Sequence, residues 1–127
     1  YDMVDDPAYE KASIQAGACL ALWARSNKGC LIGADMAGAR GRTAEYIGIR
    51  TAENLLEDLQ RGATVDRHLA DQIIPFAALA EGWSSYLIPA MTEHVETRLW
   101  LMEKMLGTKT EVRANLVRIQ GIGYQRG

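Results

Sequence analysis

Three stretches of the sequence carry apolar residues at intervals of three and four, and this spacing constrains the fold more than any other feature. A helix with that period turns its apolar residues to one side, so each stretch predicts a helix buried along a single face. Such a helix needs a second layer to pack against. The three stripes are Gly48, Ala52, Leu55 and Leu59; Leu69, Ile73, Phe76 and Ala80; and Val95, Leu99, Met102 and Leu106.

Capping residues stand at the ends of these stretches. Thr43, Thr64 and Thr92 precede the three helices, and a threonine hydroxyl there accepts a hydrogen bond from a free backbone N–H. Gly62 and Gly107 follow the first and the third, where a helix readily ends in the left-handed conformation. The sequence therefore predicts helices that begin after each threonine.

Short strands are predicted around the helices. The stretch "GACLALWARSNKGCLIGAD" indicates a hairpin about the turn residues Ser26 to Gly29. "SSYLIPAM", "KTEVR" and "NLVRIQG" indicate three further strands. Because helices and strands mix without strict alternation, we predict an α+β fold in which an open mixed sheet is covered by helices.

The hairpin register also predicts the state of the two cysteines. Facing positions add up to about 55, so Cys19 lies opposite position 36 or so rather than opposite Cys30, out of disulfide reach. We therefore predict two reduced, mostly buried thiols. With no CxxC pair and only 2 histidines, a structural zinc site is not expected.

Length and charge limit the class of protein. The chain has 127 residues, of which 48% are hydrophobic, and this suits one soluble domain. Residues 1–14 read as a linker or the start of a fragment, and residues 15–127 as a single α+β domain. No apolar run spans a bilayer and the acidic start is unlike a leader, so we expect a cytoplasmic protein without membrane contact. The formal net charge of -2 means that any nucleic-acid contact must come from a local basic cluster.

Polar side chains share one face of the second predicted helix. His68, Asp71 and Gln72 have the i, i+3, i+4 spacing, and Pro75 removes an N–H on the same face and bends the axis. Two interpretations stay open. One is a solvated, kinked helix face; the other is the rim of a pocket that offers an acid, an amide and a flat imidazole to a ligand.

The same spacing recurs in His94, Thr97 and Arg98 at the start of the third predicted helix. His94 falls in the first turn, where free N–H groups attract phosphate and the helix dipole disfavours an imidazolium. A neutral imidazole is the form that acts as a nucleophile or a base. A partly exposed histidine without chemical function is the alternative.

Three motifs, taken in order, resemble the C-terminal portion of the RNA 3'-terminal phosphate cyclase family. They are "GADMAGARGRTAEYIG", "VDRHLADQIIPFAALA" and "HVETRLWLMEKMLG". The family pattern has a Gly-Ala-Asp loop with spaced glycines, a Leu-Ala-Asp-Gln helix and a His-x-x-Thr-Asn helix. The resemblance covers residues 15–121 and implies the βαβαββ-type repeat unit of that fold.

The resemblance implies a ligase-type reaction that consumes ATP and releases AMP. Family enzymes convert an RNA 3'-phosphate into a 2',3'-cyclic phosphodiester through an AMP bonded covalently to a histidine. On this pattern His94 is the nucleophile, and Asp71 and Gln72 line the nucleotide pocket. His68 stands where relatives carry a residue that stacks on adenine. The implied cofactors are ATP and a divalent metal, Mg or Mn, and the implied partner is an RNA 3'-phosphate end.

The chain also departs from the family pattern. Arg98 replaces the usual Asn, and Ala39 stands where Glu is common. Arg98 and the loop residues Arg40 and Arg42 are expected to contact RNA or phosphate, with solvated loop arginines as the alternative for the last two. The family's N-terminal half supplies the metal-binding Glu, so no metal ligand is assigned in this chain. We therefore expect the chain to hold the nucleophile half of an active site.

Two classes of function compete. The leading hypothesis is an enzyme, or the C-terminal part of one, that adenylates itself and cyclises RNA ends. The rival is a non-catalytic, cyclase-like binding module that serves ribosome assembly. Such relatives lack the nucleophilic histidine, so the presence of His94 favours the enzyme. A scaffold for a missing partner half also stays open.

Overall fold

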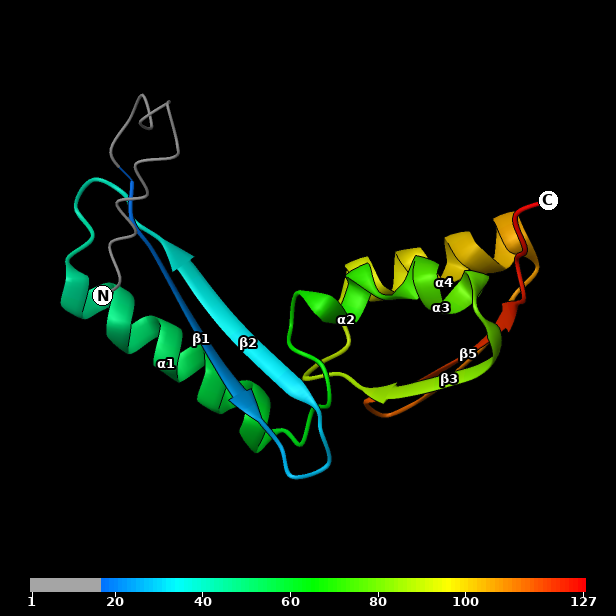
Figure 1. Ribbon diagram of the computed structural model, residues 1–127, viewed down its shortest axis with the longest axis horizontal. Coiled ribbons are helices and arrows are strands. Elements are labelled where there is room, and N and C mark those ends of the chain that lie inside the picture. The colour runs from blue at the N-terminus through cyan, green and yellow to red at the C-terminus, as the bar shows by residue number, and fades with distance from the viewer. Residues whose placement is uncertain (1–16) are drawn as a thin grey trace.

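The computed structural model describes residues 17–127 and arranges them as two units (Figure 1). The first, the hairpin unit, comprises β1 (Cys19–Arg25), β2 (Leu31–Ala37) and α1 (Ala44–Gln60). The second, the sheet unit, comprises α2 (Leu69–Gln72), α3 (Ile74–Leu79), β3 (Glu81–Leu87), α4 (Glu93–Leu106), β4 (Lys109–Arg113) and β5 (Leu116–Ile122).

The hairpin unit is a two-stranded antiparallel ribbon with α1 across one face. Cys19 pairs with Ala37, so the register differs by one position from the predicted one. Both cysteines are free, as predicted. The prediction that they are mostly buried is wrong for Cys19, which is exposed, while Cys30 is half-buried. Strand alternation puts Cys19 on the same face of β1 as Ala21 and Trp23, which are also exposed.

The sheet unit encloses the hydrophobic core. Its three strands pair antiparallel in the order β3-β5-β4, and α3 and α4 pack on one face of the sheet (Figure 1). Burial of apolar side chains between these two layers is the main force that holds the unit together. The core residues are Val65, Ala70, Ile74, Ala77, Ala78, Tyr86, Ile88, Val95, Leu99, Val117 and Ile119.

Two helices confirm the predicted caps. The Thr43 hydroxyl accepts from the Tyr46 N–H at 3.1 Å at the start of α1. The Thr92 hydroxyl accepts from the Val95 N–H at 3.3 Å at the start of α4. α4 ends at Gly107, which has a φ of 68°. Local signals of this kind predict helix ends well because the partners lie within one turn.

The middle helix differs from the prediction. The chain forms two short helices, α2 and α3, that meet at Ile73, because Pro75 at the second position of α3 cannot continue the hydrogen-bond ladder. The predicted stripe is displaced by one residue: Ile74 is fully buried and Phe76 is 73% exposed. Thr64 does not cap α2; its hydroxyl accepts instead from the Leu87 N–H at 2.9 Å.

The α+β class, with helices covering open sheets, is confirmed. Both sheets are antiparallel, and from β2 onward the order of strands and helical segments follows the expected βαβαββ pattern, with α1 to α3 together filling the first helical segment. The predicted linker 1–14 lies outside the described residues. Within those residues, no helix has the length and apolarity needed to cross a bilayer.

Candidate functional site

A cavity of about 410 Å³ opens between the hairpin and α2. It holds two of the polar residues singled out from the sequence, His68 and Gln72, one turn apart at its α2 wall. The opposite wall comes from the two strands. The volume of the cavity lies in the range typical of small-ligand sites, roughly 300–1,000 Å³. The lining residues are Ala21, Leu22, Trp23, Gly33, Ala34, Asp35, Asp66, His68, Leu69 and Gln72.

Asp66 joins the two walls of this cavity. One carboxylate oxygen accepts from the backbone N–H of Gly33 in β2 at 3.3 Å. The other accepts from the N–H groups of His68 and Leu69 at 3.0 and 2.8 Å. The side chain thereby satisfies free donors at the start of α2 and ties that start to the ribbon. The position of His68 in the cavity wall follows from these hydrogen bonds.

Asp71 belongs to a different contact. Its carboxylate pairs with Arg98 of α4, with 3.1 Å between Oδ2 and Nε. Asp71 is largely covered, whereas the Arg98 side chain is 42% exposed. The pair joins α2 to α4 and leaves part of the guanidinium open to solvent. Of the three residues in the first polar stripe, Asp71 therefore faces α4, while His68 and Gln72 line the cavity.

The Asp71 carboxylate also acts on the core beside it. Tyr86 donates from its hydroxyl to the backbone carbonyl of Ala70 at 3.4 Å. Burial, and to a lesser degree the negative charge of Asp71, raises the pKa of Tyr86 to about 12. The phenol therefore stays neutral at physiological pH, and the charge next to it is compensated by Arg98.

His94 is exposed at the second position of α4, in the first turn after the Thr92 cap. It precedes Arg98 by one turn on the same face. The Arg98–Asp71 pair joins the second turn of α4 to α2, and the two helices are in contact. Two carboxylates, Glu93 and Glu96, share this first turn and compensate the positive end of the helix dipole.

The two loop arginines lie in the hairpin unit. Arg42 donates from Nη1 to the carbonyl of Ala37 at 3.1 Å and lines a hollow of about 320 Å³ at the start of α1. Arg40 lines a neighbouring hollow of about 390 Å³ next to Gly38. Both are exposed. Of the residues predicted to contact RNA, Arg40 and Arg42 therefore lie in the hairpin unit, whereas Arg98 lies on α4 of the sheet unit.

Sequence reasoning missed Trp23 of β1. Its side chain is 73% exposed and lines the cavity that His68 and Gln72 share. Strand alternation could have indicated its direction, because it turns Trp23 to the same face as Ala21, away from α1. The partner wall lies more than forty residues further along the chain, and no local pattern indicates it.

A metal centre is not assembled from the described residues alone. Between residues 17 and 127, no three His, Cys, Asp or Glu side chains are grouped so as to hold an ion. The acidic residues near the cavity, Asp35 and Asp66, are two in number, and Asp66 already accepts backbone hydrogen bonds.

Comparisons with known proteins agree on one family. The family profile described as RNA 3'-terminal phosphate cyclase matches residues 7–112. The chain is 39% identical over 97 residues to the RNA 3'-terminal phosphate cyclase of Methanopyrus kandleri, covering 76% of this chain and 28% of that protein. It is 33% identical over 127 residues to the protein of the same name from Korarchaeum cryptofilum, covering 96% of this chain and 36% of the relative. The chain therefore spans about a third of the length of the curated relatives that it matches.

Proposed function

The chain belongs to the RNA 3'-terminal phosphate cyclase family, and we propose that it supplies the nucleophile-bearing part of an ATP-dependent enzyme that cyclises RNA 3'-phosphates. The observation that carries the proposal is the contact between α2 and α4. This contact joins α2, whose segment places His68 and Gln72 in the cavity wall, to α4, whose first turn bears His94.

In the first step, a ring nitrogen of neutral His94 attacks the α-phosphorus of ATP. A P–N bond forms, the P–O bond to the leaving group breaks, and pyrophosphate departs with the electron pair. Backbone N–H groups of the first turn of α4 favour a phosphate near the imidazole. A phosphate held there lies close to the attacking nitrogen.

In the second step, an oxygen of the RNA 3'-phosphate attacks the same phosphorus and takes AMP from His94, which regenerates the imidazole. The neighbouring 2'-hydroxyl then attacks the activated 3'-phosphorus. The cyclic phosphodiester forms, AMP leaves with its phosphate, and the hydroxyl proton passes to solvent or to a base. The fixed proximity of the 2'-oxygen makes this ring closure effectively unimolecular.

The side chains around the cavity take binding roles in this proposal. Trp23 and His68 offer flat faces to the adenine, and Gln72 offers an amide to its polar edge. Arg98 binds a phosphate with the donors that Asp71 leaves free, because a guanidinium carries five N–H groups. Asp71 then acts by orienting Arg98 rather than by touching the nucleotide, which revises its role as a pocket residue.

We further propose that other parts of a longer protein complete the active site. A divalent cation would neutralise charge on the triphosphate, and we assign its ligands mainly to residues outside this chain. Large apolar side chains on the open surface of α1, such as Ile49 at 60% exposure, support packing against the rest of a longer protein. The relatives are about three times as long as this chain, which also supports packing against further parts of a longer protein.

The test is covalent labelling of the full-length protein with ATP carrying a labelled α-phosphate, followed by a denaturing gel. His94→Ala should abolish the label, and the label should be labile in acid and stable in base, as expected for a P–N bond. The chain has only 2 histidines, so His68→Ala is the matched control and should keep labelling at saturating ATP.

Two outcomes contradict the proposal. A label retained by His94→Ala would remove this residue as the nucleophile. A wild-type protein that binds RNA ends but takes up no label would favour the rival function, a non-catalytic binding module.

A further inference from the structure

The outer face of the three-stranded sheet, on the side away from the core, has its own pattern. Strand alternation sends the core residues Tyr86, Val117 and Ile119 to the helices and the intervening residues outward. The outward residues, named here the outer face, are Glu81, Trp83, Ser85 and Leu87 of β3, Leu116, Arg118, Gln120 and Ile122 of β5, and Lys109, Glu111 and Arg113 of β4.

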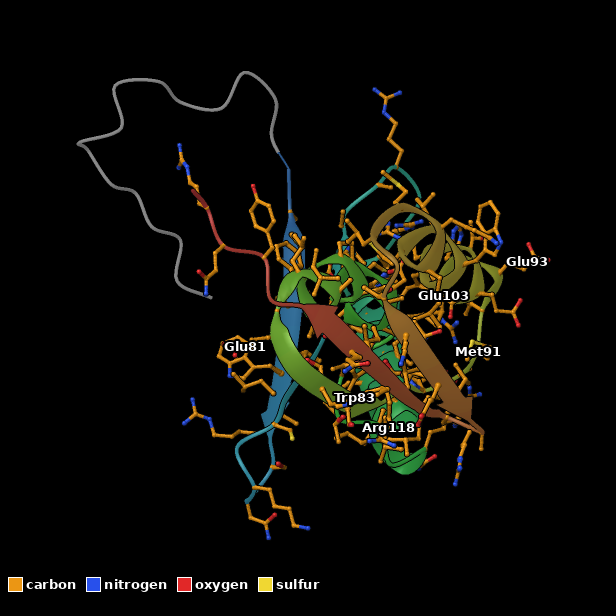
Figure 2. All side chains as sticks on the ribbon, turned by 90° about the vertical axis from the view of Figure 1, so that its right-hand side faces the viewer. Glu81, Trp83, Met91, Glu93, Glu103 and Arg118 are labelled. Atoms are coloured by element: carbon orange, nitrogen blue, oxygen red, sulfur yellow. The ribbon has the colours of Figure 1, made fainter. Side chains whose placement is uncertain are left out.

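An aromatic platform lies on this face. The Arg118 guanidinium lies over the ring of Trp83, 4.8 Å from its centroid (Figure 2). Glu111 pairs with Arg118 at 2.8 Å and holds the guanidinium in place. Trp83 nevertheless remains 43% exposed. The result is a fixed, flat and partly open surface of ring and guanidinium, which is the kind of surface on which nucleobases stack.

Cations follow each other along the face at a regular interval. The strand register aligns Lys109 with Trp83, Arg118 with Glu111, and Arg113 with Leu87 in three successive rows. Rows on one face of a sheet lie about 7 Å apart. Arg118 and Glu111 pair in the middle row, so the net positive charge comes from Lys109 and Arg113 in the two outer rows. Glu81 lies beyond Trp83 at the start of β3. A polyanion lying along the strands therefore meets a net positive charge at each end of the face.

A hollow adjoins the platform at its Trp83 end. It measures about 820 Å³ and runs from Trp83, Gln120 and Lys109 around the edge of β4 to Thr108. The Thr108 hydroxyl is buried and has no hydrogen-bond partner within residues 17–127.

We propose that the outer face binds the single-stranded RNA that leads to the 3' end. That the ligand is RNA rests on the proposed function. That it binds at the outer face rests on the arrangement of side chains there. One base stacks on the Trp83–Arg118 platform, and the backbone phosphates lie near Lys109 and Arg113. The Arg113 end of the face is the end at which β3 leads into α4, the helix that carries His94 (Figure 1).

The pattern predicts binding that is tolerant of sequence. Stacking and phosphate contacts are available to every nucleotide, and the platform offers few groups that read base edges. The acidic pI of about 5.7 makes a diffuse attraction of the whole chain for RNA an unsuitable explanation. The local row of cations is what distinguishes this face.

The first experiment measures fluorescence anisotropy of a labelled oligonucleotide of about ten residues with the 127-residue chain. Trp83→Ala should weaken binding about tenfold or more, since the loss of one stacked base typically costs that much. Trp83→Phe keeps a ring and should retain most of the affinity, which separates stacking from any loss of folding. Trp100→Ala on α4, which removes an aromatic ring that is 56% exposed, is the matched control and should bind as wild type.

The second experiment measures the salt dependence of the same binding. The double variant Lys109→Gln and Arg113→Gln should lower the slope of log K against log salt by about 1 to 2, because each lost phosphate contact contributes about 0.7 for single strands. Lys104→Gln, on the last turn of α4, is the matched control. None of these outer-face variants should affect AMP labelling of His94, because that step uses no RNA.

The proposal is overturned by equal affinity of Trp83→Ala and wild type, by an unchanged salt slope in the double variant, or by absence of oligonucleotide binding to the wild type. If sedimentation instead shows self-association that Trp83→Ala abolishes, the face is a protein contact and not an RNA site. All of these results are compatible with His94 labelling, so they separate this inference from the proposed function.

Discussion

The two units of the molecule are similarly rich in apolar residues but differ in what they bury. Every residue of the hydrophobic core comes from the sheet unit or from Val65 just before it. In the hairpin unit, Ile32 is the one buried apolar side chain among the described residues, and the fully buried residues of α1 are the polar Thr51 and Asp58. A unit of this kind cannot supply much hydrophobic stabilisation by itself.

Polar contacts, rather than a shared core, join the two units. The Asp58 carboxylate accepts from Nε and Nη2 of Arg67 and from its backbone N–H, at distances between 2.8 and 3.3 Å. The hydrogen bond to Asp58 raises the pKa of Arg67, so the guanidinium stays charged. Asp66 adds the bond to Gly33. The units are therefore held in a defined relation at the edge of the candidate nucleotide cavity, and the difference between them suggests that one stabilises the fold and the other builds the site.

The largest expected effect tests whether stability resides in the sheet unit. A Cβ added at Gly121 of β5 would overlap the carbonyl oxygens of Ala77 and Ala80, and backbone atoms cannot move aside. Gly121→Ala should therefore cost about 4 kcal/mol or more in free energy of unfolding, in the range of severe strain and overpacking. Thermal and urea unfolding followed by circular dichroism measure it.

The matched control lies in the hairpin unit. A Cβ at Gly48 of α1 meets nothing within 4 Å, so Gly48→Ala should stabilise the helix by about 0.5 to 1 kcal/mol. A small effect at Gly121 and a large loss at Gly48 would reverse the comparison between the units.

A smaller effect concerns the buried phenol of the sheet unit. Tyr86 has a pKa of about 12 in the folded chain, against about 10 when unfolded. Below pH 10 the neutral form is present in both states, so this contribution to stability is complete. Between about pH 10 and 12 only the unfolded chain ionises, and up to about 2 to 3 kcal/mol is lost as pH rises through the folded pKa.

Urea unfolding of wild type and Tyr86→Phe at a series of pH values measures this loss as the difference between the two proteins. The difference should change only above about pH 10. Tyr46→Phe in the hairpin unit, where the ring is 49% exposed, is the control for removing a phenol hydroxyl from the surface. A flat profile for Tyr86→Phe would contradict the buried environment of this phenol.

Several features could be predicted from the sequence because their causes are local. The Thr92 cap, the α4 stripe and the terminal Gly107 all lie within one helix, and all are confirmed. The stripe of the middle helix was displaced because Pro75 breaks the helix and restarts it with a new phase. The exposure of Cys19 was missed because burial of the second face of a ribbon depends on elements far along the chain.

The candidate site shows the same division. The spacing of the polar stripe put His68, Asp71 and Gln72 on one face, and in the structure only His68 and Gln72 line the cavity. The Asp71–Arg98 pair depends on how α2 meets α4, which spacing within either helix does not reveal. The roles of His94, Arg40 and Arg42 stay predictions, because they concern ligands rather than the arrangement of this chain.

The smallest expected effect on stability comes from a variant in the hairpin unit. It tests whether this unit contributes to nucleotide binding while contributing little to stability. Trp23 is 73% exposed, so Trp23→Ala should change the free energy of unfolding by less than about 0.5 kcal/mol. The same variant should weaken adenine nucleotide binding about tenfold if the ring stacks on the base, as single stacking contacts do. Calorimetry with AMP measures the affinity, and quenching of tryptophan fluorescence reports the stack, with Trp100→Ala as the control.

A double-mutant cycle then connects the two walls of the cavity. If Trp23 and His68 hold the same base, the losses from Trp23→Ala and His68→Ala should not add, because once one face of the base is released the other contact is weakened as well. Strict additivity would mean that the residues act on different parts of the ligand. AMP affinity unchanged in Trp23→Ala would remove the hairpin unit from the nucleotide site, even if His94 takes up AMP as proposed, and the sheet unit would then carry both the stability and the chemistry.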